Sequence, residues 1–260
     1  MVDSKAEALA EEVLSALELD TFPIDPLKIA ADEKIELAPS SNFGREFHGC
    51  LQYHWPQGKF ILCYPVDAAG VLSPRGRFSV AHELGHFYNL NDRTFLIENA
   101  CNEALGGFIC DDEMEFAANS FAGALLIPRS AVLPMITGSG LMELSALKKI
   151  SVCFNTSIQC AALRYAKLTT RSCSIIISRN GRRRFQVDSD QALKSGARRV
   201  RMIPPDSLVA KRGPHLSYPV GRDTLSTTWF GDDSRSFRMR EEAIGVDVPG
   251  HSLTMLSWDS

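Results

Sequence analysis

The sequence lacks a C-x-x-C pair, an internal repeat, a low-complexity tract and an apolar run of the roughly 20 residues that a bilayer span requires. Its seven cysteines are scattered, mostly among apolar neighbours, which is typical of thiols that serve as small core residues in a reducing compartment. The first twenty residues have no basic region followed by an apolar stretch, so they do not resemble a signal peptide. We therefore expect a cytoplasmic protein with no membrane partner.

The chain also lacks a strong excess of one charge, since its formal net charge at pH 7 is −3. A local exception is the segment from Arg171 to Arg212, which contains eleven Lys or Arg residues and only three acids, Asp188, Asp190 and Asp206. Such a stretch can hold a phosphate backbone. Because it has no regularly interleaved aromatics and no recognisable reading helix, we favour a solvated or partner-facing surface over contact with nucleic acid.

Hydrophobic periodicity predicts an α+β fold with a helical core and a small twisted antiparallel sheet, followed by a β-rich unit. We expect domains at 1–169 and 170–260. Helices are predicted at 6–17, from Pro26, from Arg75 to the polar loop at 89–92, and at 111–127, 142–149 and 157–167. Strands are predicted at 35–37, 49–53, 59–64, 175–178, 184–187, 229–230, 236–239 and 253–258.

One short motif carries chemistry, His82-Glu83-Leu84-Gly85-His86. On a helix, residues four apart lie on one face, so both imidazoles can reach one zinc ion and leave positions for a third ligand and a water. Glu83 projects beside that face, where its carboxylate can take a proton from the water. The alternative is a polar patch on a surface helix, but the apolar neighbours predict burial, which is costly for such a cluster without a metal or partners.

A third ligand is required, and no histidine occurs between His86 and His215; position 92, where a metzincin has its third histidine, is Asp. A carboxylate from a later helix is the natural substitute. Glu115 shares a face with two small residues that allow a close helix approach, whereas Glu113 shares a face with bulky ones, and this separates the two only weakly. Charge at a helix start explains either residue equally simply. The candidates are Glu98, Glu103, Asp111, Asp112, Glu113 and Glu115.

The segments RFSVAHELGH at 77–86, EFAANSFA at 115–122 and LLIP at 125–128 together resemble the ImmA/IrrE family of metallopeptidases. The resemblance covers about residues 5–168. It implies one zinc ion per chain, held by His82, His86 and Glu115, with Glu83 as the catalytic base. Two features depart from the family: residues 60–65 lack an Asn often found there, and the region after 170 resembles no known sensor domain.

The resemblance also implies a function, because family members cleave or inactivate regulatory proteins, commonly DNA-binding repressors. We therefore expect a zinc endopeptidase acting on a repressor, in stress response or mobile-element control. The alternative is a non-proteolytic binding module, or a toxin–antitoxin or DNA-binding regulator, in which the metal serves structure only. These hypotheses differ at Glu83, which only an enzyme needs for turnover.

Three further side chains are candidate donors to the oxyanion of a tetrahedral intermediate, which needs a preorganised hydrogen bond. Tyr88 lies two residues from His86, on the opposite side of the helix, so a core position is the simpler interpretation. His48 and His54 flank a predicted strand to which an extended peptide could add. Surface histidines are commoner than catalytic ones, so a surface position is the favoured interpretation and an oxyanion donor the alternative for both. We assign no role to His215 and His251.

Overall fold

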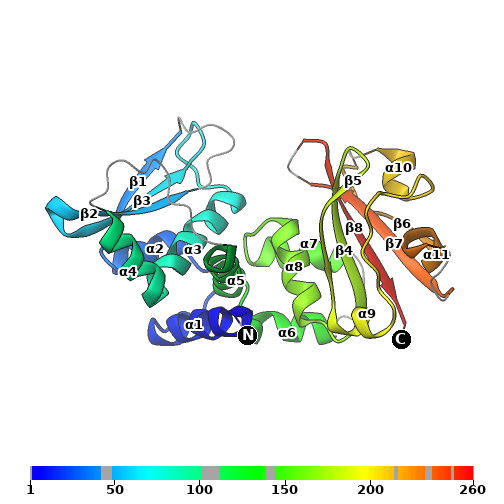
Figure 1. Cartoon of the computed structure of the whole chain (residues 1–260), viewed down its shortest axis with the longest axis horizontal. Helices are drawn as coiled ribbons and strands as arrows, with labels where there is room; N and C mark the ends of the chain where they lie inside the picture. Colours follow the sequence, from blue (N-terminus) through cyan, green and yellow to red (C-terminus); the bar gives the residue numbers. More distant parts are fainter. Residues whose placement is uncertain are drawn as a thin grey trace. The chain divides into compact units, whose positions relative to one another are not determined.

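The structure, a computed structural model, describes residues 2–41, 49–100, 112–138, 144–213, 216–231, 236–246 and 249–259. It is α+β, as predicted (Figure 1). Two compact units divide it: unit 1 comprises 1–128 with 153–157, and unit 2 comprises 129–152 with 158–260. The predicted domain boundary at residue 169 stays a prediction. The packing of the chain into compact units does not by itself decide where an independent sequence domain ends.

Unit 1 contains the predicted helices of the first half of the chain and one further helix that was not predicted. Two of them begin where the sequence supplies a cap, since Asp25 accepts a hydrogen bond from the N–H of Leu27 and Ser73 accepts one from Gly76. A proline follows each cap at the first helical position, where its missing N–H costs nothing. The helices are α1 (Val2–Ala16), α2 (Pro26–Asp32), α3 (Pro74–Tyr88), α4 (Leu90–Asn99) and α5 (Asp112–Leu126).

The prediction of a polar loop at 89–92 is wrong. Asn89 closes α3 and at once caps α4, because its side-chain oxygen accepts the N–H of Asn91 at 3.1 Å. Asn and Asp residues favour helix starts as strongly as loops, and the composition alone does not separate the two.

The small sheet of unit 1 has three strands, β1 (Glu36–Ser40), β2 (Cys50–His54) and β3 (Lys59–Pro65), in the order β1-β3-β2. A short 3-10 turn, Trp55–Gln57, joins β2 to β3 as an antiparallel hairpin. The prediction that the sheet is wholly antiparallel is wrong, because β1 pairs with β3 in parallel. An apolar alternation fixes which face a strand buries but not its direction.

Unit 2 combines three helices with a five-stranded antiparallel sheet of order β5-β4-β8-β7-β6 (Figure 1). The helices are α6 (Arg129–Gly138), α7 (Leu144–Cys153) and α8 (Ile158–Leu168). The strands are β4 (Ser172–Arg179), β5 (Arg182–Asp188), β6 (Val220–Leu225), β7 (Arg238–Gly245) and β8 (His251–Trp258). Three short helices join them, α9 (Asp190–Lys194), α10 (Leu208–Arg212) and α11 (Ser226–Phe230).

The strand predicted at 229–230 is therefore wrong, because these residues end α11. Trp229 and Phe230 are buried in an apolar cluster with Ile176, Met239 and Trp258 of the sheet. Aromatic residues suit a buried helix as well as a strand, and a run of two has no period that separates the cases.

Two buried acids of β7 have structural partners. Glu241 accepts the N–H of Leu208 at 2.6 Å and pairs with Arg222 at 2.7 Å, while Glu242 accepts the N–H of Leu144 at 3.1 Å. Each carboxylate thus accepts a buried N–H at the start of a helix, which has no partner within the helix, and this offsets part of the cost of burying the charge.

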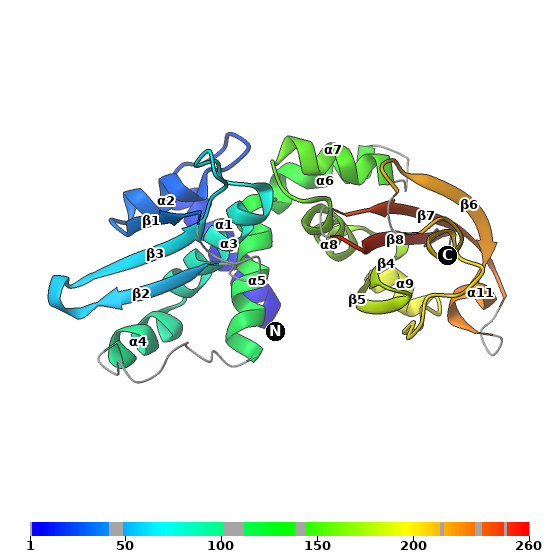
Figure 2. The same ribbon diagram turned by 90° about the horizontal axis from the view of Figure 1, so that it is seen from above.

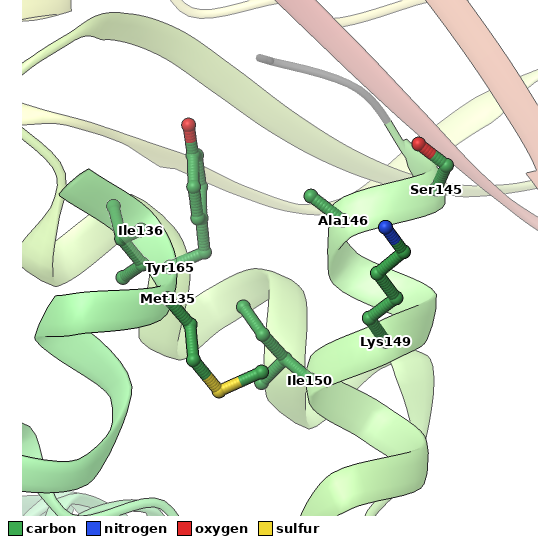
Figure 3. Close-up of a pocket in the computed structure, with 7 residues that line it drawn as sticks. All are labelled: Met135, Ile136, Ser145, Ala146, Lys149, Ile150 and Tyr165. Atoms are coloured by element: carbon green, nitrogen blue, oxygen red, sulfur yellow. The ribbon is translucent and has the colours of Figure 1, made fainter. Parts of the chain in front are cut away.

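A small cavity lies among α6, α7 and α8 of unit 2 (Figure 3). Ile136, Ile150 and Tyr165 line it, and its volume is about 50 Å³. Ligand pockets usually measure about 300 Å³ or more, so this space suits a water molecule or two at most.

Within the described residues, no single helix has the length and apolar character to cross a membrane, and α5 with α6 meets those criteria only as a bent pair.

Candidate metal centre

The candidate site lies wholly in unit 1, where α3 and α5 lie side by side in both views (Figures 1 and 2). Gly85 allows this close packing. A Cβ at that position would lie 3.0 Å from the Cα of Ala118 and 3.2 Å from its carbonyl oxygen. The glycine of the motif thus removes the one side-chain atom that would hold the two backbones apart, and Ala118 contributes only a methyl group.

This packing brings His82 and His86 of α3 together with Glu115 of α5. The two Nε2 atoms are 3.2 Å apart. The Glu115 carboxylate reaches both rings, with Oε2 at 3.2 Å from His82 Nε2 and Oε1 at 3.5 Å from His86 Nε2. One ligand atom from each residue lies within 4.8 Å of the others, so the three form a group able to hold a metal ion.

Each imidazole is oriented through its other nitrogen. His86 Nδ1 lies 2.9 Å from Oδ2 of Asp92, a carboxylate that is only 2% exposed. His82 Nδ1 lies 3.2 Å from Oδ1 of Asn119. Both partner atoms are acceptors, so each Nδ1 carries the proton and each neutral ring turns the lone pair of Nε2 toward Glu115.

This donor set fits a divalent metal ion. Two nitrogens that bind one ion at about 2.0–2.1 Å in tetrahedral geometry lie about 3.3 Å apart, close to the separation seen here. Without a cation, two lone pairs and a carboxylate would face one another at short range, which is electrostatically unfavourable. The orienting carboxylate on His86 is the arrangement that metal-binding histidines commonly show.

A proton is the alternative cation in the absence of a metal, and the pKa of His86 reflects this. Burial lowers that pKa, but the hydrogen bond to Asp92 and the negative charges of Glu83, Glu115 and Asp92 outweigh burial and raise it. Metal binding would therefore displace a proton from the group.

Glu83 projects from α3 toward β2. The backbone N–H of Leu51 donates to its carboxylate, and an added Cβ at Gly49 would lie 3.2 Å from Oε1. Desolvation by burial raises the pKa of Glu83, against the opposing charges of His82 and His86 and the Leu51 N–H; Glu115 raises it further. A carboxylate whose pKa is raised toward neutrality is a better proton acceptor in catalysis.

The other candidate ligands that the structure describes do not join the group. Glu98 of α4 and Glu113 at the start of α5 have exposed side chains. Glu103 and Asp111 lie outside the described residues, as does the side chain of Asp112. Among the candidates that the structure describes, Glu115 is the one whose carboxylate lies against both rings.

The structure describes two of the three candidate oxyanion donors, Tyr88 and His54. The hydroxyl of Tyr88 donates to Glu33 at 2.8 Å and its ring stacks on Phe121, so this half-buried side chain has partners outside the metal group. His54 ends β2, and its buried Nδ1 has no partner within the part of the chain that the structure describes. His48 and His215 lie outside that part, and His251 contacts the carbonyl of Pro249 in unit 2.

Sequence reasoning missed the orienting residues. Asp92 was weighed only as a missing histidine, and Asn119 only as part of a motif. An acid shortly after a metal-binding histidine is a natural orienting partner, so the sequence does contain a signal for Asp92. That signal can be recognised only when it is known that α3 ends at Tyr88, because Asp92 then contacts Nδ1 of His86.

Comparison with known proteins agrees with this site. The chain matches eleven solved chains, among them a Mycobacterium tuberculosis transcriptional regulator, at 12% identity and a TM-score of 0.62. The alignment covers 98% of this chain and 76% of that one, and at this identity it shows a shared fold alone. No curated protein matches the chain. Residues 71–165, which include the three residues of the group, match the peptidase family described as the IrrE N-terminal-like domain. The expected resemblance to this family is thereby confirmed for residues 71–165.

Proposed function

We propose that the chain is a zinc-dependent endopeptidase that cleaves a regulatory protein, with a DNA-binding repressor as the substrate. The observation that carries the proposal is the convergence of two Nε2 atoms and one carboxylate, with each Nδ1 committed to an acceptor. A purely polar surface patch has no need of that second set of contacts.

In this proposal His82, His86 and Glu115 hold one zinc ion. When bound, the ion supplies Lewis acidity, which makes water easier to deprotonate and polarises a peptide carbonyl. Glu83 accepts the proton of the attacking water at its carboxylate and passes it to the leaving amine. Leu51 positions Glu83 through its N–H, and Asp92 with Asn119 keeps the rings in the productive tautomer.

The substrate would bind as an extended segment along β2. This strand pairs on one side with β3 and ends the order of the three-stranded sheet within the described residues. Its start, at Gly49 to Leu51, contacts Glu83, so a peptide added to this edge would pass the catalytic carboxylate. A regulatory protein is the proposed source of that segment because family members act on such proteins, and the solved M. tuberculosis neighbour is described as a transcriptional regulator.

Metal analysis of the purified protein tests the site. We expect one zinc ion per chain in the wild type and a loss of at least tenfold in zinc affinity in Glu115→Gln. Glu113→Gln is the matched control, because it removes the same charge from the same helix at an exposed position. Equal zinc affinity in both variants would exclude Glu115 as the third ligand.

Cleavage is tested by co-expression with repressors encoded near its gene. We expect fragments with the wild type and intact repressor with Glu83→Gln, which keeps the size of the side chain but cannot accept a proton. Fragments in both cases would remove Glu83 from the mechanism. If Glu83→Gln and the wild type both bind a repressor and neither cleaves it, the chain is the binding module described above.

A further inference from the structure

Charge is divided unequally between the two units. Unit 1 contains 20 acidic and 8 basic residues, whereas unit 2 contains 11 acidic and 20 basic ones. The small net charge of the whole chain therefore conceals an acidic catalytic unit and a basic second unit. A basic unit of this kind attracts polyanions.

The fold gathers part of this charge at one edge of the sheet of unit 2. Strand β5 ends the strand order, and the segment 198–203 runs along it. The N–H of Ile203 donates to the carbonyl of Gly181 at 2.9 Å, and Arg182 pairs with Met202 in an isolated bridge. The side chain of Gln186 completes the link, since it donates to the carbonyl of Arg198 at 3.0 Å and accepts the N–H of Val200 at 2.8 Å.

Two arginine runs that are separate in the sequence thereby become neighbours. We name this surface the arginine edge and define it by Arg179, Arg182, Arg184, Arg199 and Arg201. All five side chains are exposed, and none has an ion pair with any acid in the part of the chain that the structure describes. The buried side chains of Val200 and Ile203 anchor the second run, so the arginines between and beside them point outward.

Two members of the edge oppose each other directly. Arg179 and Arg182 are cross-strand partners at the β4–β5 hairpin, whose turn is Asn180 and Gly181, both with positive φ. Like charges at directly opposed positions destabilise a sheet. An anion that binds both guanidinium groups would remove that repulsion.

We propose that the arginine edge binds the phosphate backbone of nucleic acid without reading its sequence. All five members are Arg, whose planar fork binds phosphate oxygens in pairs, whereas Lys would act as a point charge. A protein partner is a poorer fit, since protein interfaces need an apolar, charge-depleted centre. The edge offers only Phe185 and Met202 as exposed apolar side chains, at 47% and 58% exposure.

Fluorescence anisotropy of the full-length protein tests the proposal, with a 30-base-pair duplex and a 30-nucleotide single strand of arbitrary sequence as probes. If five phosphates are contacted, log K falls against log salt with a slope of about −4.5 for duplex, and affinity drops roughly 500-fold between 50 and 200 mM salt. The double variant Arg199→Ala with Arg201→Ala should reduce that slope by about 2.

Three controls separate this edge from general basicity. Arg238→Ala with Lys148→Ala removes two exposed charges elsewhere in unit 2 and should leave the slope unchanged. Replacing Arg199 and Arg201 by Lys should restore most of the salt dependence. Glu83→Gln should bind nucleic acid as the wild type does, because the arginine edge lies in unit 2. Nucleic-acid binding by this edge does not depend on peptidase activity.

The form of the nucleic acid is resolved in the same experiment. Single-stranded nucleic acid can stack a base on Phe185, whereas a duplex keeps its bases paired. If single-stranded nucleic acid is the ligand, Phe185→Ala should weaken its binding several-fold and leave duplex binding unchanged. The proposal is overturned if neither probe binds at 50 mM salt, if the arginine and control variants lose affinity equally, or if polyglutamate binds as tightly as both probes.

Discussion

Substituting Gly85 by Ala tests whether close packing of α3 on α5 sets the metal group. The new Cβ would meet Ala118 Cα at 3.0 Å, whereas non-bonded carbon atoms prefer about 3.5–4.0 Å. The two backbones must therefore separate by a few tenths of an ångström. Overpacking of this kind costs about 1–3 kcal/mol.

The substitution also has a favourable effect, because Ala is better than Gly inside a helix by roughly 0.5–1 kcal/mol. We expect the overpacking to prevail, with a net loss of about 0.5–2 kcal/mol in the free energy of unfolding. For a chain of this size that corresponds to a fall of roughly 1–8 °C in the melting temperature.

The effect on metal binding should be larger than the effect on stability. Metal sites tolerate deviations of about 0.2 Å in ligand distance, and a shift of α5 carries Glu115 away from both histidines. We expect a loss of about 10–100-fold in zinc affinity, measured by competition with a chromogenic chelator.

Gly123→Ala is the matched control on α5, because an added Cβ there meets nothing within 4 Å. It should stabilise the protein slightly through helix propensity and leave zinc affinity unchanged. If Gly85→Ala also keeps its zinc affinity and melting temperature, the close helix contact does not position the third ligand, and the reasoning fails.

Three other outcomes follow from the structure. Asp92→Asn should weaken zinc binding about 10–100-fold in the chelator assay, because an amide holds the Nδ1–H of His86 less strongly than a carboxylate does; unchanged affinity would remove Asp92 from the site. In the metal-free protein the pKa values of His86 and Glu83 are raised, so their stabilising effect is complete below the ordinary values of 6.5 and 4.5 and is lost as pH rises through the higher folded values. The melting temperature in chelator should therefore fall as pH rises above 4.5 and continue to fall above 6.5, and it should fall less in Glu83→Gln; a steeper fall in that variant would contradict the shift of Glu83. Alkylation mapped by peptide mass should modify exposed Cys153 quickly and Cys160 slowly, since burial raises the pKa of Cys160 to about 12; equal rates would refute that burial.

The elements that could be predicted from sequence are those whose signals are local. Asp25 and the proline that follows it predict the helix at Pro26. Short apolar runs between turn residues predict the strands β2 and β3. The parallel direction of β1 could not be predicted, since it depends on which edge of β3 remains free. The strand β6 was missed because it alternates exposed and half-buried residues and has no apolar run.

The two histidines and Glu83 could be proposed from the sequence because one helix fixes their relation to one another. Glu115 needed a resemblance to be preferred, because the choice between it and Glu113 depends on how α5 is rotated against α3. The juxtaposition of the arginine runs is of the same kind, since it depends on the pairing of Arg182 with Met202 across nineteen intervening residues.

Asp92 shows most clearly how a local reading can name the right position for the wrong reason. A metzincin places its third histidine six residues after the second, and from the sequence Asp92 is only the absence of that ligand. In this fold α3 ends two residues after His86, and Asn89 starts a new helix at once. The chain therefore turns back, and the carboxylate of Asp92 meets Nδ1 of His86 and not the face that carries Nε2. The position keeps a role in the metal site, but as an orienting partner, which leaves the third ligand to α5.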